Sequence, residues 1–204
     1  YDVSNYNAID PLFGTMEDFE ELLEVVHLNK LKLIIDQVLS HSSDQHEAFI
    51  NSKKSKESEK SDWYVWADAK EDGSPPNNWL SVFGGSAWEW EPVRGQYYLH
   101  NFLPSQPDFN FHNEEVQEFL LNSVKFWLEK GVDGFRLDTV NYYFHDQELR
   151  DNPKSPKKFK RPPINTYYLQ DQVHSINQLE NLEFLEKFRK LLDSYPQKTS
   201  VGEV

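Results

Sequence analysis

The chain has 204 residues, of which 38% are hydrophobic and 15% aromatic, enough for a packed core of one large domain or two small ones. Its 34 acidic residues against 21 basic ones give a formal net charge of −13, so we expect neither nucleic acid nor an anionic membrane surface as a partner. The lack of cysteine excludes disulfides and thiolate metal sites, and no apolar stretch approaches the roughly 18 residues of a membrane span.

The first forty residues predict a helix followed by a strand. Thr15 can cap the helix, acidic residues fill its first turn, and its apolar residues recur at helical spacing. Residues 31–39 are almost continuously apolar, with Asp36 embedded, and we interpret them as a buried parallel strand that ends at Ser40 and His41. The apolar residues of the helix are Phe19, Leu22, Leu23 and Val26.

The middle of the chain changes character twice. Residues 42–112 break into short aromatic-rich segments interrupted by glycine and proline, so we expect an irregular small lobe. A 3.6-residue period then returns over 116–127 and predicts a helix that ends at Gly131. The remaining predicted elements are a strand over 132–140, a long loop over 142–178 that includes a solvated basic run at 154–161, a helix over 182–192 and a strand at 200–204.

Strands that alternate with helices predict a parallel sheet with right-handed crossover connections. Only three strands are predicted, and an open sheet of three parallel strands would expose two long unpaired edges, which natural domains avoid. Completion of a barrel removes this difficulty. We therefore predict an α/β fold that forms part of a (β/α)8 barrel.

Two of the predicted strands end in carboxylates, Asp138 and Glu203. Because the carboxyl ends of parallel strands meet at one face, we expect both side chains there, with a substrate between them. Two carboxylates so placed are the minimum equipment for breaking a glycosidic bond. Glu203 is one residue from the last, on a strand that is barely complete, so we interpret the chain as a piece of an enzyme.

Short segments along the whole chain form an ordered set. They are residues 1–6 (YDVSNY), 13–15 (FGT), 36–41 (DQVLSH), 77–79 (NNW), 84–88 (GGSAW), 106–110 (QPDFN), 134–138 (GFRLD) and 202–204 (GEV). Together they resemble the α-glucosidases of the α-amylase superfamily, glycoside hydrolase family 13, including its long insert after the third barrel strand. The segment QPDFN resembles the branch of oligo-1,6-glucosidases and α-glucosidases more than the endo-acting amylases.

The resemblance implies roles for three charged residues. Asp138 corresponds to the nucleophile, which attacks the anomeric carbon and forms a glycosyl-enzyme intermediate. It must stay ionised, and Arg136, two residues back on the same side of the strand, supplies the stabilising charge. Glu203 corresponds to the general acid/base, which protonates the leaving oxygen and then deprotonates water.

The resemblance also implies residues that bind the substrate. His41 matches a histidine that hydrogen-bonds the sugar in the cleavage subsite, and Tyr1 matches the aromatic platform under the same sugar. Phe83 and Phe102 fall where the family's insert supplies apolar walls to the cleft, although simple core aromatics are an equally good interpretation. Thr139 directly follows the nucleophile, where threonine accompanies a preference for α-1,4 over α-1,6 bonds.

Some family features are missing. Ser40 replaces an asparagine that helps to bind calcium in the amylases, and the calcium loop of related glucosidases would lie upstream of Tyr1, so we assign no metal and expect no organic cofactor. The family's third catalytic carboxylate, an aspartate after a histidine at the seventh strand, is also absent. Residues 144–146 imitate that dipeptide, but they closely follow Asp138, so we interpret them as loop structure.

We thus predict a retaining exo-α-glucosidase that acts on maltose and short oligosaccharides, is cytoplasmic, and is inactive as the isolated chain. The alternatives are oligo-1,6-glucosidases, trehalose-hydrolysing or transglycosylating relatives and, in another class, a non-catalytic partner-binding protein on the same fold. The predicted barrel portion extends from about strand two or three to strand five, with an irregular subdomain inserted after strand three. The predicted divisions are 1–41 and 113–204 for the barrel and 42–112 for the insert.

Overall fold

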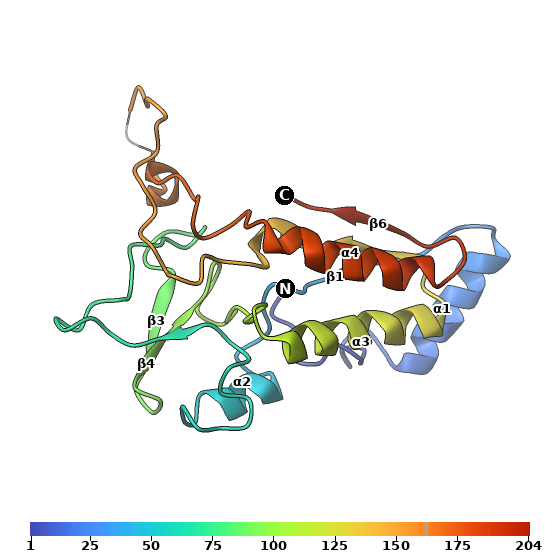
Figure 1. Cartoon of the computed structure of the whole chain (residues 1–204). Coiled ribbons are helices and arrows are strands. Elements are labelled where there is room, and N and C mark those ends of the chain that lie inside the picture. Colours follow the sequence, from blue (N-terminus) through green and yellow to red (C-terminus); the bar gives the residue numbers. More distant parts are fainter. Residues whose placement is uncertain (162) are drawn as a thin grey trace.

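The computed structural model describes residues 1–161 and 163–204 (Figure 1). Pro162, which belongs to the predicted 142–178 loop, lies outside the described residues. A three-stranded sheet runs through the body that carries both marked ends of the chain. Its strands are parallel and lie in the order β1 (Ile34–Gln37), β5 (Gly134–Leu137) and β6 (Thr199–Gly202).

Each of these strands follows a helix, so the predicted alternation of helix and strand is confirmed. In the first helix, the Thr15 hydroxyl accepts a hydrogen bond from the Asp18 N–H and the Asp18 carboxylate accepts one from the Thr15 N–H, which forms a capping box. The helix that precedes β5 ends at Gly131, whose φ of 105° lies in the left-handed region that glycine adopts without strain. The helices are α1 (Met16–Leu28), α3 (Glu114–Lys130) and α4 (Glu180–Asp193).

The parallel strands are shorter and more open than the apolar runs predict. The run at 31–39 predicts a buried strand, whereas β1 has only four residues and Ile34 is 45% exposed. β1 lies at the edge of the sheet and pairs with β5 alone, so its outer side has no neighbouring strand among the residues that the structure describes. The prediction of burial is therefore wrong at Ile34, while the parallel pairing is confirmed.

The register of the sheet decides which side chains meet at its carboxyl edge. Asp36 of β1 lies opposite Arg136 of β5, and Arg136 lies opposite Val201 of β6. At the amino ends of β5 and β6, Gly134 lies opposite Thr199, and a Cβ atom there would come within 2.2 Å of the Thr199 carbonyl oxygen. Only glycine fits at that position.

The inserted segment contains more regular structure than predicted. Three very short strands form an antiparallel sheet in the order β2, β4, β3, and its hairpin turns at Gly95. A Trp90–Tyr97 ring pair, 5.0 Å between centroids, bridges two of its strands. The strands are too short for an alternating pattern to be recognised, so the prediction missed them. Most of residues 42–112 nevertheless lie outside helices and strands, as predicted. The elements are α2 (Glu47–Ser52), β2 (Trp66–Ala67), β3 (Trp88–Glu91) and β4 (Gln96–Leu99).

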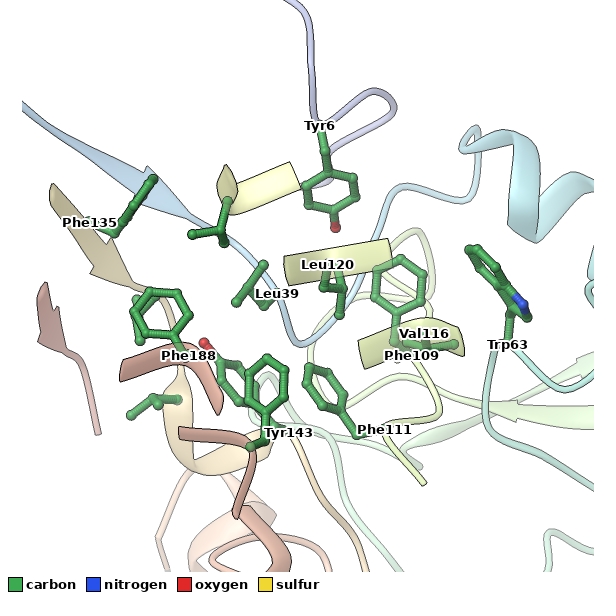
Figure 2. Close-up of a cluster of buried hydrophobic side chains, with 14 of the residues drawn as sticks. Tyr6, Leu39, Trp63, Phe109, Phe111, Val116, Leu120, Phe135, Tyr143 and Phe188 are labelled. Carbon is green, nitrogen blue, oxygen red and sulfur yellow. The ribbon is translucent and has the colours of Figure 1, made fainter. Parts of the chain in front are cut away.

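One hydrophobic cluster joins the inserted segment to the parallel sheet. Figure 2 shows Phe109 of the insert beside Leu120 of α3. Trp63 of the insert, Phe135 of β5 and Phe188 of α4 belong to the same cluster. The buried residues of a second, smaller cluster lie in the insert and include Trp79, Trp88 and Leu99, and Leu149 of the 142–178 loop packs against them. The insert therefore combines a core of its own with a shared one.

The long segment after β5 is mostly loop, as predicted, with the short 3-10 helices η1 (Val140–Tyr142) and η2 (Thr166–Leu169). It is hydrogen-bonded to the insert. The Trp79 indole donates to the Arg150 carbonyl at 2.8 Å, and the Asn165 amide donates to the Val82 carbonyl at 2.6 Å. Within residues 1–161 and 163–204, no helix combines the length and the apolar character needed to cross a membrane.

Candidate active site

A cavity of about 360 Å³ opens at the carboxyl edge of the parallel sheet. Asp2, Leu103 and Gln106, which were not singled out from the sequence, contribute to its lining. All the site residues predicted from the sequence also line it, namely Tyr1, His41, Phe83, Phe102, Arg136, Asp138, Thr139 and Glu203. The fold therefore brings together residues that the sequence distributes over its whole length.

Arg136 is the electrostatic centre of this cavity. One guanidinium nitrogen donates to Asp138 Oδ1 at 2.5 Å and to Asp36 Oδ2 at 2.9 Å, and the other contacts Glu203. Three carboxylates from three neighbouring strand ends thus share one cation. The predicted contact between Arg136 and Asp138 is confirmed, and the parallel register adds Asp36, whose participation the sequence did not indicate.

This sharing changes the expected electrostatics of Asp138. Its side chain is buried, and that burial raises its pKa. The hydrogen bond and charge of Arg136 lower the pKa, but the neighbouring carboxyls of Glu203 and Asp36 raise it again, and the net shift is upward. Asp36 foremost, and then Asp138, raise the pKa of Arg136, which stays protonated. Arg136 therefore only partly offsets the effect of burial on Asp138.

Thr139 turns the chain sharply after Asp138. Its φ of 43° lies in the left-handed region, which is strained for a β-branched residue and costs about 1–2 kcal/mol. The turn places its hydroxyl 3.3 Å from Asp138 Oδ2. Backbone bonds continue past the strand ends, from the Val140 N–H to the Glu203 carbonyl and from the Glu203 N–H to the Leu137 carbonyl. The strained turn is therefore held on both sides.

His41 lies at the wall of the cavity and is almost completely buried. Burial lowers its pKa to about 4, so the ring is neutral at neutral pH. Its Nε2 lies 3.1 Å from the Gln106 amide nitrogen and 3.1 Å from the Tyr1 carbonyl oxygen, and its Nδ1 lies 2.8 Å from the Ser40 hydroxyl. Gln106 is the cavity residue in the QPDFN segment that sequence reasoning missed.

Aromatic rings form the remaining walls. The Arg136 guanidinium lies 5.9 Å from the centre of the Tyr1 ring, and the Phe102 ring packs 5.2 Å from His41. Phe83 is 64% exposed and packs against Phe102 at 6.2 Å. That exposure favours the cleft-wall interpretation of Phe83 over a core residue.

The dipeptide His145–Asp146 lies away from the cavity. Asp146 is buried and accepts two hydrogen bonds from the Arg150 guanidinium, each 2.8 Å long, which hold its pKa far below its usual value. Burial lowers the pKa of His145 to about 3. These contacts confirm that both residues belong to the structure of the loop.

The described residues offer no cluster of three or more His, Cys, Asp or Glu side chains arranged to hold a metal ion. The calcium site of the amylases does not fit at Ser40. Its hydroxyl is engaged with His41 Nδ1 at 2.8 Å and with the Thr139 hydroxyl at 2.9 Å, and is thus committed to protein partners.

Comparison with known proteins decides the family. The family model described as Alpha amylase, catalytic domain, matches residues 1–204. This chain belongs to the α-amylase family. Its TIM-barrel relatives share the arrangement of strands and helices described above.

Individual relatives of this α-amylase family chain are enzymes. This chain is 57% identical over 208 residues to a probable alpha-glucosidase of Rhizobium meliloti (strain 1021), and the match covers 100% of this chain and 38% of the relative. It is 42% identical over 194 residues to an oligo-1,6-glucosidase of Heyndrickxia coagulans, covering 92% of this chain and 34% of the relative. The crystal structure of the alpha-glucosyl transfer enzyme XgtA superposes with a TM-score of 0.97 at 57% identity, covering 100% of this chain and 39% of that one. The chain thus spans well under half the length of these relatives.

Proposed function

We propose that the full-length protein is a retaining exo-α-glucosidase that removes terminal α-1,4-linked glucose from maltose and short oligosaccharides. The observation that carries the proposal is that Asp138 and Glu203 line one cavity and contact the same guanidinium of Arg136. An inverting pair stands about 6.5–9.5 Å apart with a water molecule between, whereas a retaining pair is closer. Two carboxylates on one guanidinium favour the retaining arrangement.

In the proposed reaction, an Asp138 oxygen attacks the anomeric carbon while the Glu203 carboxyl donates its proton to the leaving oxygen. Glu203 then takes a proton from a water molecule, which attacks the same carbon and releases Asp138. Arg136 holds the attacking carboxylate in place, and His41 forms part of the cavity wall against which the sugar lies. These steps use no organic cofactor, and a calcium site elsewhere in the full-length protein is compatible with them.

A preference for short substrates is supported by the shape of the cavity. Its volume of about 360 Å³ is at the low end of small-molecule sites. Phe83 and Phe102 wall it on the side of the insert, and the 142–178 loop is hydrogen-bonded to that insert. We propose that the barrel portion extends from the end of strand two to strand five, with segments 1–41 and 113–204 interrupted by the 42–112 insert.

Glucosyl transfer to an acceptor other than water is a second candidate, favoured by the likeness to an enzyme named for glucosyl transfer. The oligo-1,6-glucosidase and trehalose-hydrolysing activities differ from the first proposal in the bond cleaved. A non-catalytic role is disfavoured because both Asp138 and Glu203 line the cavity.

The test is to incubate the full-length protein with maltose, isomaltose, trehalose and longer maltodextrins and to follow the products by NMR. We expect the fastest hydrolysis with maltose, and α-glucose as the first sugar released from a nitrophenyl α-glucoside, whose single glucosyl group reports the stereochemistry. Release of β-glucose from the nitrophenyl α-glucoside, or no turnover of any α-glucoside, would contradict the proposal, and glucosylated acceptors in place of free glucose would favour transfer. The surface variant Asp193→Asn serves as the control that keeps full activity.

A further inference from the structure

A chain of hydrogen-bond contacts connects Gln106 to Asp138 across two neighbouring strand ends. The Gln106 amide nitrogen lies 3.1 Å from His41 Nε2, and His41 Nδ1 lies 2.8 Å from Ser40 Oγ. Ser40 Oγ lies 2.9 Å from Thr139 Oγ1, which lies 3.3 Å from Asp138 Oδ2. Gln106, His41, Thr139 and Asp138 line the cavity, and Asp138 also contacts Arg136.

Gln106 sets the donor-to-acceptor direction of this series of hydrogen bonds. Its amide oxygen accepts a hydrogen bond from the Leu103 N–H at 3.0 Å, so its NH₂ group faces His41. An amide nitrogen can only donate, and therefore His41 Nε2 must accept. The Tyr1 carbonyl, also 3.1 Å from Nε2, would favour the opposite tautomer. Tyr1 is a 69% exposed residue, whereas Gln106 is buried, so water can replace a hydrogen bond lost at Tyr1 more readily than one lost at Gln106. A Gln106 donor facing an Nε2–H donor has no such alternative.

The tautomer then fixes the remaining links in turn. With the proton on Nδ1, His41 donates to Ser40, and the Ser40 hydrogen is left for Thr139. Thr139 in turn donates its hydrogen to Asp138 Oδ2. The opposite tautomer would reverse every link and leave Oδ2 without this donor. A hydroxyl is required at Ser40 because the same atom must both accept and donate.

We propose that Ser40 is a positioning residue for the nucleophile Asp138. Ser40 accepts a hydrogen bond from His41 and donates one to Thr139, so that the Thr139 hydroxyl is left to donate its hydrogen to Asp138 Oδ2. This inference rests on the proposed function, since it assigns Asp138 as the nucleophile. Arg136 then holds one carboxylate oxygen and Thr139 the other, which fixes the plane of the carboxylate. The Thr139 donor also stabilises the ionised form that must attack.

The first test reads the tautomer directly and does not depend on activity. Nitrogen-15 NMR of the His41 ring in the full-length protein is expected to show a protonated Nδ1 and an unprotonated Nε2 at neutral pH. In Gln106→Ala the preference for Nδ1–H should weaken. A ring protonated at Nε2 in the unaltered protein would overturn the inference, whether or not the protein hydrolyses α-glucosides.

The second test measures the pH profile of kcat/KM for a nitrophenyl α-glucoside in Ser40→Ala, Thr139→Val and the double variant. Each single change should lower kcat by about 3–10-fold, the effect of one neutral hydrogen bond, with little change in KM. The acidic limb should move to higher pH, and the double variant should be no worse than the poorer single one.

Two controls separate positioning from folding. Ser42→Ala removes another buried serine hydroxyl, one that bonds Tyr64 outside the cavity, and should leave the acidic limb unmoved. Ser40→Thr keeps the hydroxyl and should restore the limb. Independent, additive losses in the double variant, or an unshifted acidic limb in Ser40→Ala, would overturn the role of Ser40.

Discussion

A buried carboxylate flanks each end of β5, and the surroundings shift the pKa values of the two in opposite directions. At the amino end, Asp133 accepts hydrogen bonds from Lys32 at 2.9 Å, from the Leu33 N–H at 2.9 Å and from His27 at 2.8 Å. Although burial opposes ionisation, these partners outweigh it and lower the pKa of Asp133 to about 2. At the carboxyl end, Asp138 shares Arg136 with two other carboxylates, and burial raises its pKa.

The difference separates stability from reactivity. A carboxylate with more donors than it needs contributes to folding, because its charged form is favoured in the native state. A carboxylate with too little positive charge around it costs stability and stays available for chemistry. Asp133 and Asp138 are five positions apart in the sequence, so the contrast arises from what the sheet packs against each end.

The largest expected effect is on activity. In the full-length protein, Asp138→Asn should lower turnover of a nitrophenyl α-glucoside by about 10⁴-fold or more, because an amide cannot act as the nucleophile. The free energy of unfolding should stay the same or rise, since one of three carboxylates around Arg136 is neutralised. Initial rates check the expected loss of turnover, and thermal unfolding checks the expected stability. A clear loss of stability would break the contrast with Asp133.

Glu203→Gln should have a smaller effect that depends on the leaving group. Hydrolysis of maltose should fall by about 10²–10⁴-fold, because its leaving oxygen needs a proton, whereas a nitrophenyl α-glucoside, which needs little protonation, should lose much less. Initial rates on the two substrates give the ratio. Equal losses on both would contradict the acid/base assignment.

Asp133→Asn should destabilise the protein by about 1–3 kcal/mol at neutral pH, because buried donors lose their charged acceptor. Urea unfolding measures the change, and kcat of the folded enzyme should remain near that of the unaltered protein. The matched control is Asp193→Asn, which breaks the exposed helix pair with Arg189 and should change stability by less than about 0.5 kcal/mol. An equally large loss of unfolding free energy in Asp193→Asn would contradict the stabilising role assigned to Asp133.

The smallest expected effect is the pH dependence of the stability difference between the unaltered protein and Asp133→Asn. Because the pKa of Asp133 is lowered in the folded state to about 2, its contribution is complete above the ordinary aspartate pKa of 3.8 and is lost as the pH falls toward 2. The stability gap between the unaltered protein and Asp133→Asn should therefore narrow by about 1–2 kcal/mol over that interval. Urea midpoints measured from pH 5 downward test this, and a gap that widens on acidification would have the wrong sign.

Local signals predicted what is local in this fold. The capping residue Thr15 and the terminal Gly131 marked helix ends correctly because each acts through its own backbone neighbours. The parallel pairing of the strands followed from the alternation of helix and strand. The antiparallel sheet of the insert could not be recognised, because its strands have between two and four residues and depend on pairing for their stability.

The candidate site divides in the same way. Motif residues such as His41 and Asp138 were identified because their types and spacing carry the family resemblance. Asp36 and Gln106 were missed as site residues because their roles depend on register and on contacts between distant segments. Ser40 was singled out for what it lacks, a calcium ligand, whereas its hydroxyl contacts became visible only when both strand ends were in place.

The surplus of acid around Arg136 also sets the electrostatic potential of the cavity. Asp2, Asp138 and Glu203 line the cavity, Arg136 is the one arginine or lysine among its described lining residues, and Asp36 adds its charge from the edge. The potential in the cavity is therefore negative. In the proposed reaction, such a field favours the positive charge that develops on the anomeric carbon during bond cleavage. The carboxylates that Arg136 leaves unneutralised thus stabilise the proposed transition state.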